Sequence, residues 1–152
     1  MDRLKEGIVE VDGVVLTPET TLKDLEDIGI DKAVQRFHGN AFLEVIFNHP
    51  IENDGVTFKV SVRALKNGEQ IIILLDPQFN MPIQDAISES RAKQEVCEEW
   101  LKRNMAVPPT IDSESGINYD FDWGHIFSAA SEHIHFGHTE GCIHVWYGEY
   151  PR

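Results

Sequence analysis

The chain has 152 residues, 41% of them hydrophobic and 26% charged, so it is long enough to bury a core as one domain without a disulfide or a metal. Asp and Glu number 26 against 13 Lys and Arg, a formal net charge of −13 at pH 7. Such a surface repels nucleic acid and anionic lipid, which excludes both as expected direct partners, and it attracts basic proteins.

No stretch reaches the ~18 apolar residues that a membrane span needs. Residues 1–7 lack the apolar segment of a secretory signal. The cytoplasm is therefore the expected location.

The first third of the chain predicts a hairpin followed by a short helix. The Asp-Gly dipeptide at 12–13 separates two β-branched runs, which is a strong signal for a two-residue β-turn. Thr20 or Thr21 is suited to cap a helix whose apolar residues recur every three positions, and Gly29 is placed to end it. Residues 30–40 show no such period and are expected to form an irregular connection.

The middle of the chain predicts strands of an antiparallel sheet. Residues 41–47 and 56–65 have strand patterns, and the second alternates apolar and polar side chains. The Asn-Gly dipeptide at 67–68 predicts a hairpin turn. Residues 69–75 contain a continuous apolar run, as expected of a central strand that is covered on both faces.

A long amphipathic helix is predicted at residues 83–104, with an apolar stripe on one side and charged residues on the other. Residues 105–115 contain Pro and Ser and are expected to form a loop. The elements together predict an α+β fold in a single domain, residues 1–152. Its largely antiparallel sheet has six or seven strands, with the long helix packed on one face and the short helix near the N-terminus.

The C-terminal stretch is rich in His and aromatic residues. Residues 124–131 and 142–147 are predicted to be antiparallel strands, joined by a turn at 137–140. The two cysteines, Cys97 in the long helix and Cys142 in the last strand, are expected to be buried and reduced, because the composition is not that of a disulfide scaffold.

The assumed turn brings three histidines and a cysteine to one sheet face. It sets His135 opposite Cys142 and His133 opposite His144. Opposed side chains have Cβ atoms roughly 4.5–5.5 Å apart, close enough for three imidazoles and a thiolate to hold a tetrahedral zinc ion. Because no recurring zinc motif such as paired C-x-x-C is present, surface or partner contacts are the competing interpretation of the same side chains.

Known catalytic motifs are absent from the sequence. There is no G-x-S-x-G elbow, P-loop or G-x-G-x-x-G, so neither an enzyme nor a cofactor is the leading expectation. Asp120 and Asp122 alternate around Phe121 and would share a strand face, where they could mimic an acid–base pair. The competing interpretation is an acidic surface near the chain's end, formed by Asp112, Glu114, Asp120, Asp122, Glu132, Glu140 and Glu149.

Several stretches form a recognisable pattern across most of the chain. They are the opening residues 7–25, the F-x-V-x-V and I-I-I-L runs of the middle strands, the Trp-Leu near the end of the long helix, and Y-D-F-D-W-G-x-I-x-S at 119–128. Together they resemble small bacterial immunity proteins of polymorphic or contact-dependent growth-inhibition toxin systems. The resemblance implies a protein without chemistry of its own that covers the active surface of a toxin. No functional residue is carried over by motif.

The charge suits that role, because an acidic inhibitor is steered rapidly to a basic toxin domain such as a nuclease. The leading hypothesis is therefore a binding protein for a cognate basic toxin. A metal-binding protein or metal-dependent enzyme that uses the His/Cys hairpin, and a housekeeping interaction domain, are the alternatives. Trp146 and Tyr150 are candidate aromatic hot spots if they are exposed. The predicted partner-binding residues are Asp120, Asp122, Glu132, His133, His135, His138, Glu140, His144, Trp146 and Glu149.

Overall fold

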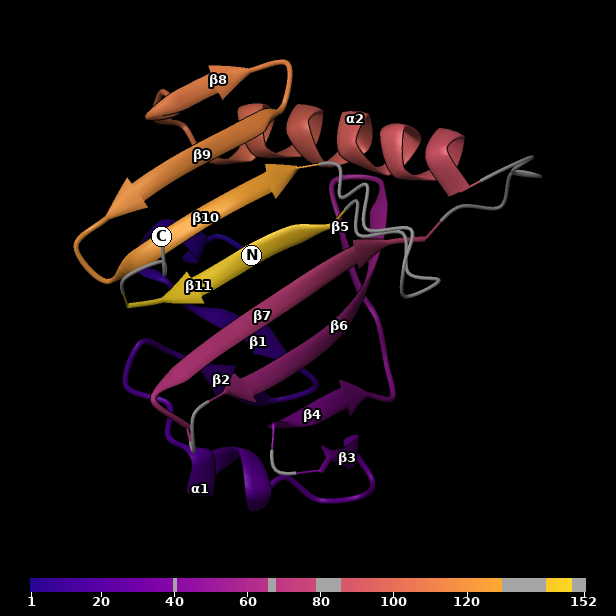
Figure 1. Ribbon diagram of the computed structural model, residues 1–152, viewed down its shortest axis with the longest axis vertical. Helices are drawn as coiled ribbons and strands as arrows, with labels where there is room; N and C mark the ends of the chain where they lie inside the picture. Colours follow the sequence, from indigo (N-terminus) through magenta and orange to yellow (C-terminus); the bar gives the residue numbers. More distant parts are fainter. Residues whose placement is uncertain (40, 66–67, 79–85, 130–141, 149–152) are drawn as a thin grey trace.

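The computed structural model describes residues 1–39, 41–65, 68–78, 86–129 and 142–148. Within these ranges the fold is α+β, with a large antiparallel sheet and one long helix (Figure 1). The strands are β1 (Val9–Val11), β2 (Val14–Leu16), β3 (Ala33–His38), β4 (Phe42–Phe47), β5 (Ile51–Asn53), β6 (Val56–Leu65), β7 (Gln70–Pro77), β8 (Ile111–Ser113), β9 (Gly116–Phe121), β10 (Gly124–Ala129) and β11 (Ile143–Tyr147); the helices are α1 (Leu22–Glu26) and α2 (Ala86–Asn104), and a 3₁₀ turn spans Leu4–Glu6.

The large sheet has the strand order β3-β4-β6-β7-β11-β10-β9-β8, and β5 pairs with β6. Among the described strands of this sheet, every pairing is antiparallel. The last strand, β11, lies between β7 and β10, so it joins the strands of the N-terminal half to those of the C-terminal half (Figure 1). Strands β1 and β2 form a separate hairpin.

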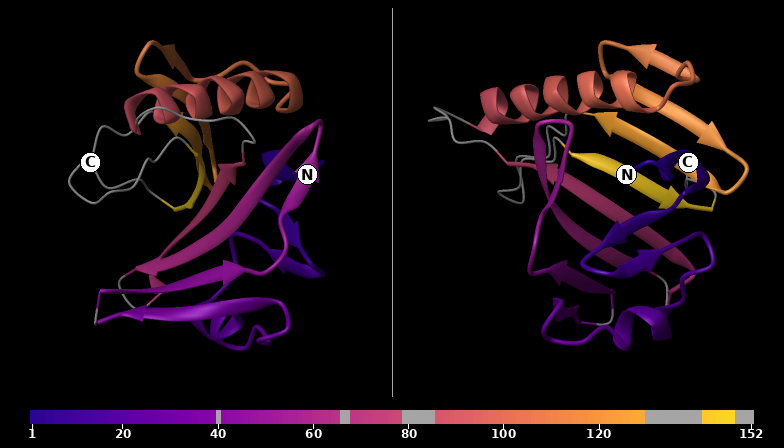
Figure 2. Two further views of the ribbon diagram at one scale, coloured as in Figure 1. Left: turned by 90° about the vertical axis from the view of Figure 1, so that its right-hand side faces the viewer. Right: turned by 180° about the vertical axis from the view of Figure 1, so that it is seen from behind.

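The two faces of the sheet differ in what covers them. We define the inner face as the one that carries Phe58, Val60 and Val62 of β6, all buried. Helix α2 and the β1–β2 hairpin both lie on this side, as the rear view in Figure 2 shows. Trp100 of α2 meets Phe58 edge-to-face, with ring centroids 5.3 Å apart, a favoured aromatic geometry.

The outer face carries the alternate residues of each strand, such as Ser61 and Arg63 of β6. At its centre lies a smaller apolar cluster whose buried members are Ile72 and Leu74 of β7 with Cys142 and Trp146. Residues 71–75 of β7 are therefore buried on both sides, which confirms the prediction of a doubly covered central strand.

Two segments that were predicted to be irregular contain strands. Residues 33–38 form β3 and residues 111–113 form β8, the two edges of the large sheet. Only Ala33 is fully buried in β3, and all three residues of β8 are exposed. An edge strand with so little burial has no hydrophobic alternation to detect, so the expected six or seven strands were too few.

Helix α1 begins as predicted but ends earlier. Thr21 is the N-cap and forms a capping box with Asp24, because each side chain accepts from the other residue's backbone N–H. The helix ends at Glu26 rather than at Gly29. The side-chain amide of Gln35 donates to the Glu26 carbonyl at 2.8 Å, so a residue on β3 provides a hydrogen bond that another helical turn would have supplied.

The long helix packs through the predicted stripe. Cys97, Trp100 and Leu101 are buried against the inner face, and the predicted start at residue 83 lies outside the described residues. Cys97 and Cys142 are both buried and not disulfide-bonded, as expected. Burial raises the pKa of the Cys97 thiol to about 12, so this thiol stays protonated at neutral pH.

Two side chains from the end of the sheet hold the N-terminal turn in place. The hydroxyl of Tyr147 donates to the Gly7 carbonyl at 2.6 Å, and the indole N–H of Trp123 donates to the Lys5 carbonyl at 2.8 Å. Gly7 has φ of 77°, and a Cβ there would lie 2.8 Å from the Trp123 ring. Glycine is therefore required both by backbone conformation and by space.

The Tyr147 hydrogen bond gives a testable stability difference. Tyr147→Phe should lower the free energy of unfolding by about 1–3 kcal/mol, because the Gly7 carbonyl loses its donor. Tyr119→Phe is the matched control, since the buried Tyr119 hydroxyl has no hydrogen-bond partner among the described residues. Urea denaturation of both variants checks this, and equal losses would contradict it.

Candidate functional site

Three of the predicted partner-binding residues, Asp120, His144 and Trp146, lie on the outer face of the sheet. Asp120 of β9 pairs with His125 of β10, and His125 pairs with Trp146 of β11, so these side chains point to one side. His144 lies on the same face of β11, two residues before Trp146. Asp122 follows the end of β9 in the turn to β10, so it does not share a strand face with Asp120 as predicted. Outside the described residues lie Glu132, His133, His135, His138, Glu140 and Glu149.

The predicted pairing of the last two strands is wrong. His144 lies opposite Phe127 rather than His133, and Ile143 lies opposite Ser128. The position of β11 is also set by its second neighbour, because Ile143 pairs with Leu75 and His144 with Leu74 of β7. The turn assumed at 137–140 lies outside the described residues. No group of three or more metal-ligating side chains occurs in the described ranges.

Trp146 is not an exposed hot spot. Its side chain is only 8% exposed, because it belongs to the apolar cluster with Ile72 and Leu74. The other aromatic candidate, Tyr150, lies outside the described residues. The outer face near β11 therefore offers packing rather than an aromatic anchor for a partner.

His144 is held as a neutral, partly buried ring. It stacks on Phe127 with centroids 4.6 Å apart, and its Nε2 lies 3.4 Å from the Cys142 Sγ. Burial first, and the nearby Arg63 guanidinium second, lower the pKa of His144 to about 4. Because the ring is uncharged at neutral pH, it cannot attract an acidic or basic partner by its charge.

The lowered pKa predicts a loss of stability in mild acid. The unfolded chain binds a proton at His144 near pH 6.5 but the folded chain does not until about pH 4, so stability falls as pH drops through this window. Between pH 7 and pH 5.2, His144 should lower the free energy of unfolding by about 1.5 kcal/mol. Urea denaturation at the two pH values should show a smaller decrease in the free energy of unfolding for His144→Phe. The exposed His49→Asn control should keep the wild-type loss, and an unchanged loss in His144→Phe would contradict the assignment.

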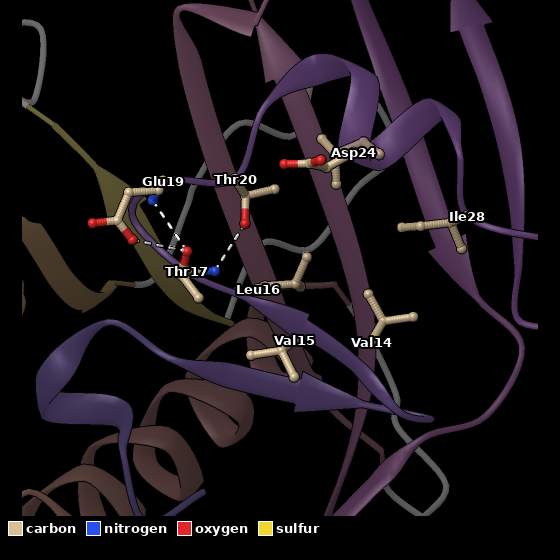
Figure 3. A pocket seen from close by; sticks show the side chains of 9 residues that line it. Val14, Val15, Leu16, Thr17, Glu19, Thr20, Asp24 and Ile28 are labelled. Carbon is tan, nitrogen blue, oxygen red and sulfur yellow. Dashed lines mark hydrogen bonds between the residues drawn. The ribbon is translucent and has the colours of Figure 1, made fainter.

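A hollow that the sequence did not predict lies between β2 and α1 (Figure 3). Its volume is about 420 Å³. The apolar part is formed by two elements, the β1–β2 hairpin and the short helix with its following turn, while threonines and carboxylates complete the rim. The lining residues are Val14, Val15, Leu16, Thr17, Glu19, Thr20, Asp24, Leu25 and Ile28.

Strand β2 borders the hollow with an open edge. Within the described part of the chain, β2 pairs only with β1. Val11 pairs with Val14 across a two-residue turn, and Val9 pairs with Leu16. These alternate pairs exchange the ladder hydrogen bonds, so the N–H and C=O of Val15 point away from β1. The Val15 side chain is 52% exposed.

Carboxylates are concentrated in the segment that forms this hollow, and two of them, Glu19 and Asp24, line it. Residues 10–32 hold seven Asp or Glu against two Lys, a net charge of −5 out of the chain's −13. Among the described residues, none of the seven makes an ion pair with a Lys or Arg; Asp12 alone has a histidine, His49, at 3.3 Å. Hydrogen bonds from Thr21 lower the pKa of Asp24, which keeps it ionised.

Several acidic residues elsewhere have a Lys or Arg within reach. Lys93 lies 2.9 Å from Asp76, Arg103 lies 2.9 Å from Asp54, and Lys102 of α2 lies 3.1 Å from Asp112. Asp120 contacts His125 at 2.5 Å. Among the described residues, the segment from β1 to the turn after α1 therefore combines a net charge of −5 with no ion pair to Lys or Arg.

Sequence reasoning found the hairpin and α1 but assigned neither of them to a binding surface. The available signal was the run of five carboxylates between Glu19 and Asp31 opposed only by Lys23. The hollow itself arises because the hairpin and the helix are brought side by side on the inner face. No local sequence pattern indicates that the hairpin and the helix come close together.

No family model, curated protein or solved structure matches this chain. In the described ranges, no helix has both the length and the apolar character to cross a membrane.

Proposed function

We propose that this protein is a non-catalytic inhibitor that binds a basic toxin domain and covers its active or substrate-binding surface. The proposal takes its class from the resemblance to immunity proteins noted in the sequence. It takes its physical support from the charge of −13 and from where that charge is concentrated. A protein with this role needs a rigid scaffold and a complementary surface, and no reacting group of its own.

The observation that carries the proposal is the set of unpaired carboxylates around the hollow between β2 and α1. Ion pairs near α2 would have to be broken before their acids could bind a partner's Lys or Arg. The acids of residues 10–32 have no Lys or Arg partner to release, so their charge can steer a basic partner. They also retain the pairing capacity to hold that partner once it has docked.

Exposed apolar side chains accompany these acids. Val15 is 52% exposed and Ile30, in the turn after α1, is 86% exposed. Apolar contacts inside a charged rim are the usual composition of a specific protein interface. The surface predicted from the sequence, around Asp120 and Trp146, has the acids but its aromatic ring is buried.

The test begins with the partner. The tagged protein should recover one basic protein from its native host, and the complex should lack the toxic activity that the free partner shows. Recovery of a partner whose activity is unaffected would favour a housekeeping interaction domain. Recovery of no partner would contradict tight inhibition.

Charge reversal then locates the surface. Glu26→Lys with Asp27→Lys should slow association with the recovered partner by about tenfold or more at low salt, because local steering is lost. Glu95→Lys with Glu99→Lys on the exposed side of α2 is the matched control, since it changes the net charge equally. Stopped-flow or surface-based kinetics measure both. Equal slowing would mean that only the total charge matters.

A further inference from the structure

We infer that an extended basic segment of the partner docks as a third strand on the open edge of β2, with an apolar side chain in the hollow and cationic side chains at its acidic rim. This inference rests on the proposed function and specifies its mode of contact. Strand addition at a free sheet edge is a common way to bind an extended peptide.

The backbone geometry of β2 permits this addition. Val15 directs its N–H and C=O away from β1, toward the side where α1 lies across the hollow (Figure 3). An added strand therefore gains main-chain hydrogen bonds without displacing the existing pair of strands. Among the described residues, no second strand pairs with this edge of β2.

The side chains of β2 specify an alternating partner. Val14 and Leu16 line one face, toward the hollow and Leu25, whereas Val15 lies on the opposite, exposed face beside its pairing partner Glu10. Residues of an added strand follow the same alternation. Those that face the hollow must be apolar, and those on the exposed face lie near Glu10.

The charge selects a basic segment rather than a neutral or acidic one. Glu19 and Asp24 line the hollow, and Glu10 lies across β2. The outer edge strand of the large sheet, β3, carries Arg36 and His38 instead, so it repels a basic strand. Charge complementarity thus favours β2 over β3, while at the other edge, β8, the acidic Asp112 is already paired with Lys102 at 3.1 Å.

The probe is the acetylated and amidated pentapeptide Arg-Val-Arg-Val-Arg, titrated into the full chain labelled with both ¹⁵N and ¹³C. The Val15 amide and the Val14 and Ile28 methyl groups should shift together. The peptide Glu-Val-Glu-Val-Glu should produce no shift at these positions. A basic peptide that is N-methylated on the amides facing Val15 should bind at least tenfold more weakly, because it cannot form the ladder.

Charge-neutralising variants test whether the acidic side chains beside β2 contribute to binding of the basic peptide. Glu10→Gln with Glu19→Gln should weaken binding of the basic peptide at least threefold, and the loss should shrink at high salt. Glu95→Gln with Glu99→Gln on α2 is the control and should bind as the wild type does. These substitutions are exposed and isosteric, so circular dichroism should show unchanged folding.

Several results would overturn the docking mode. Equal binding of the N-methylated peptide, or shifts confined to β3 or β8, would exclude strand addition at β2. A Val15 shift that follows protein concentration without peptide would assign the edge to a second copy of this chain. If a basic partner is recovered and inhibited but leaves Val15 unperturbed, docking on β2 fails while the inhibitor role stands. If the peptide binds at β2 but no partner is inhibited, docking on β2 stands while the inhibitor role fails.

Discussion

The pairing of β11 between β7 and β10 is the constraint on which the rest of the fold depends. It makes one sheet of strands that are far apart in the chain, and it aligns Ile143 and Val145 with the inner-face core. The same insertion carries Tyr147 to the N-terminal turn, where its hydroxyl holds the Gly7 carbonyl. The N-terminal hairpin is thereby anchored on the inner face, and the position of β2 relative to α1 follows from that anchoring.

The inner face has two coverings, and the hollow lies at one of them. Helix α2 covers the part of the sheet near β9 and β10 (Figure 2). Cations near its end form ion pairs, such as Arg103 with Asp54. The hairpin and α1 cover another part less completely and leave the hollow. An uneven distribution of cations thus separates a surface that is electrostatically satisfied from one that is available to a basic partner.

The outer face illustrates how burial removes residues from consideration as contacts. His144 and Trp146 look like recognition residues in the sequence because polar and aromatic side chains are common at interfaces. In the fold they belong to a packed layer with Phe127, Ile72 and Leu74. Desolvation then keeps the imidazole uncharged, so its role is to fill space between strands.

Much of the fold could be predicted from local patterns, whereas the site could not. The alternation in β6, the apolar run of β7, the stripe of α2 and the cap at Thr21 all lie where the sequence indicated. Strands β3 and β8 were missed, since edge strands bury too little to show a period. The register of β11 was mispredicted because it depends on two neighbours, one of them far away in sequence.

By itself, the sequence determined the α+β class, the antiparallel pairing of nearby strands and the excess of negative charge, because periodicity, turn residues and composition are local properties. Only the tertiary structure decided which carboxylates keep their charge unopposed, that Trp146 is buried, and that β2 faces α1 across a hollow. Those outcomes depend on which distant segments meet. Their free energy comes from burial and ion pairing between elements, and no single stretch of the chain contains that information.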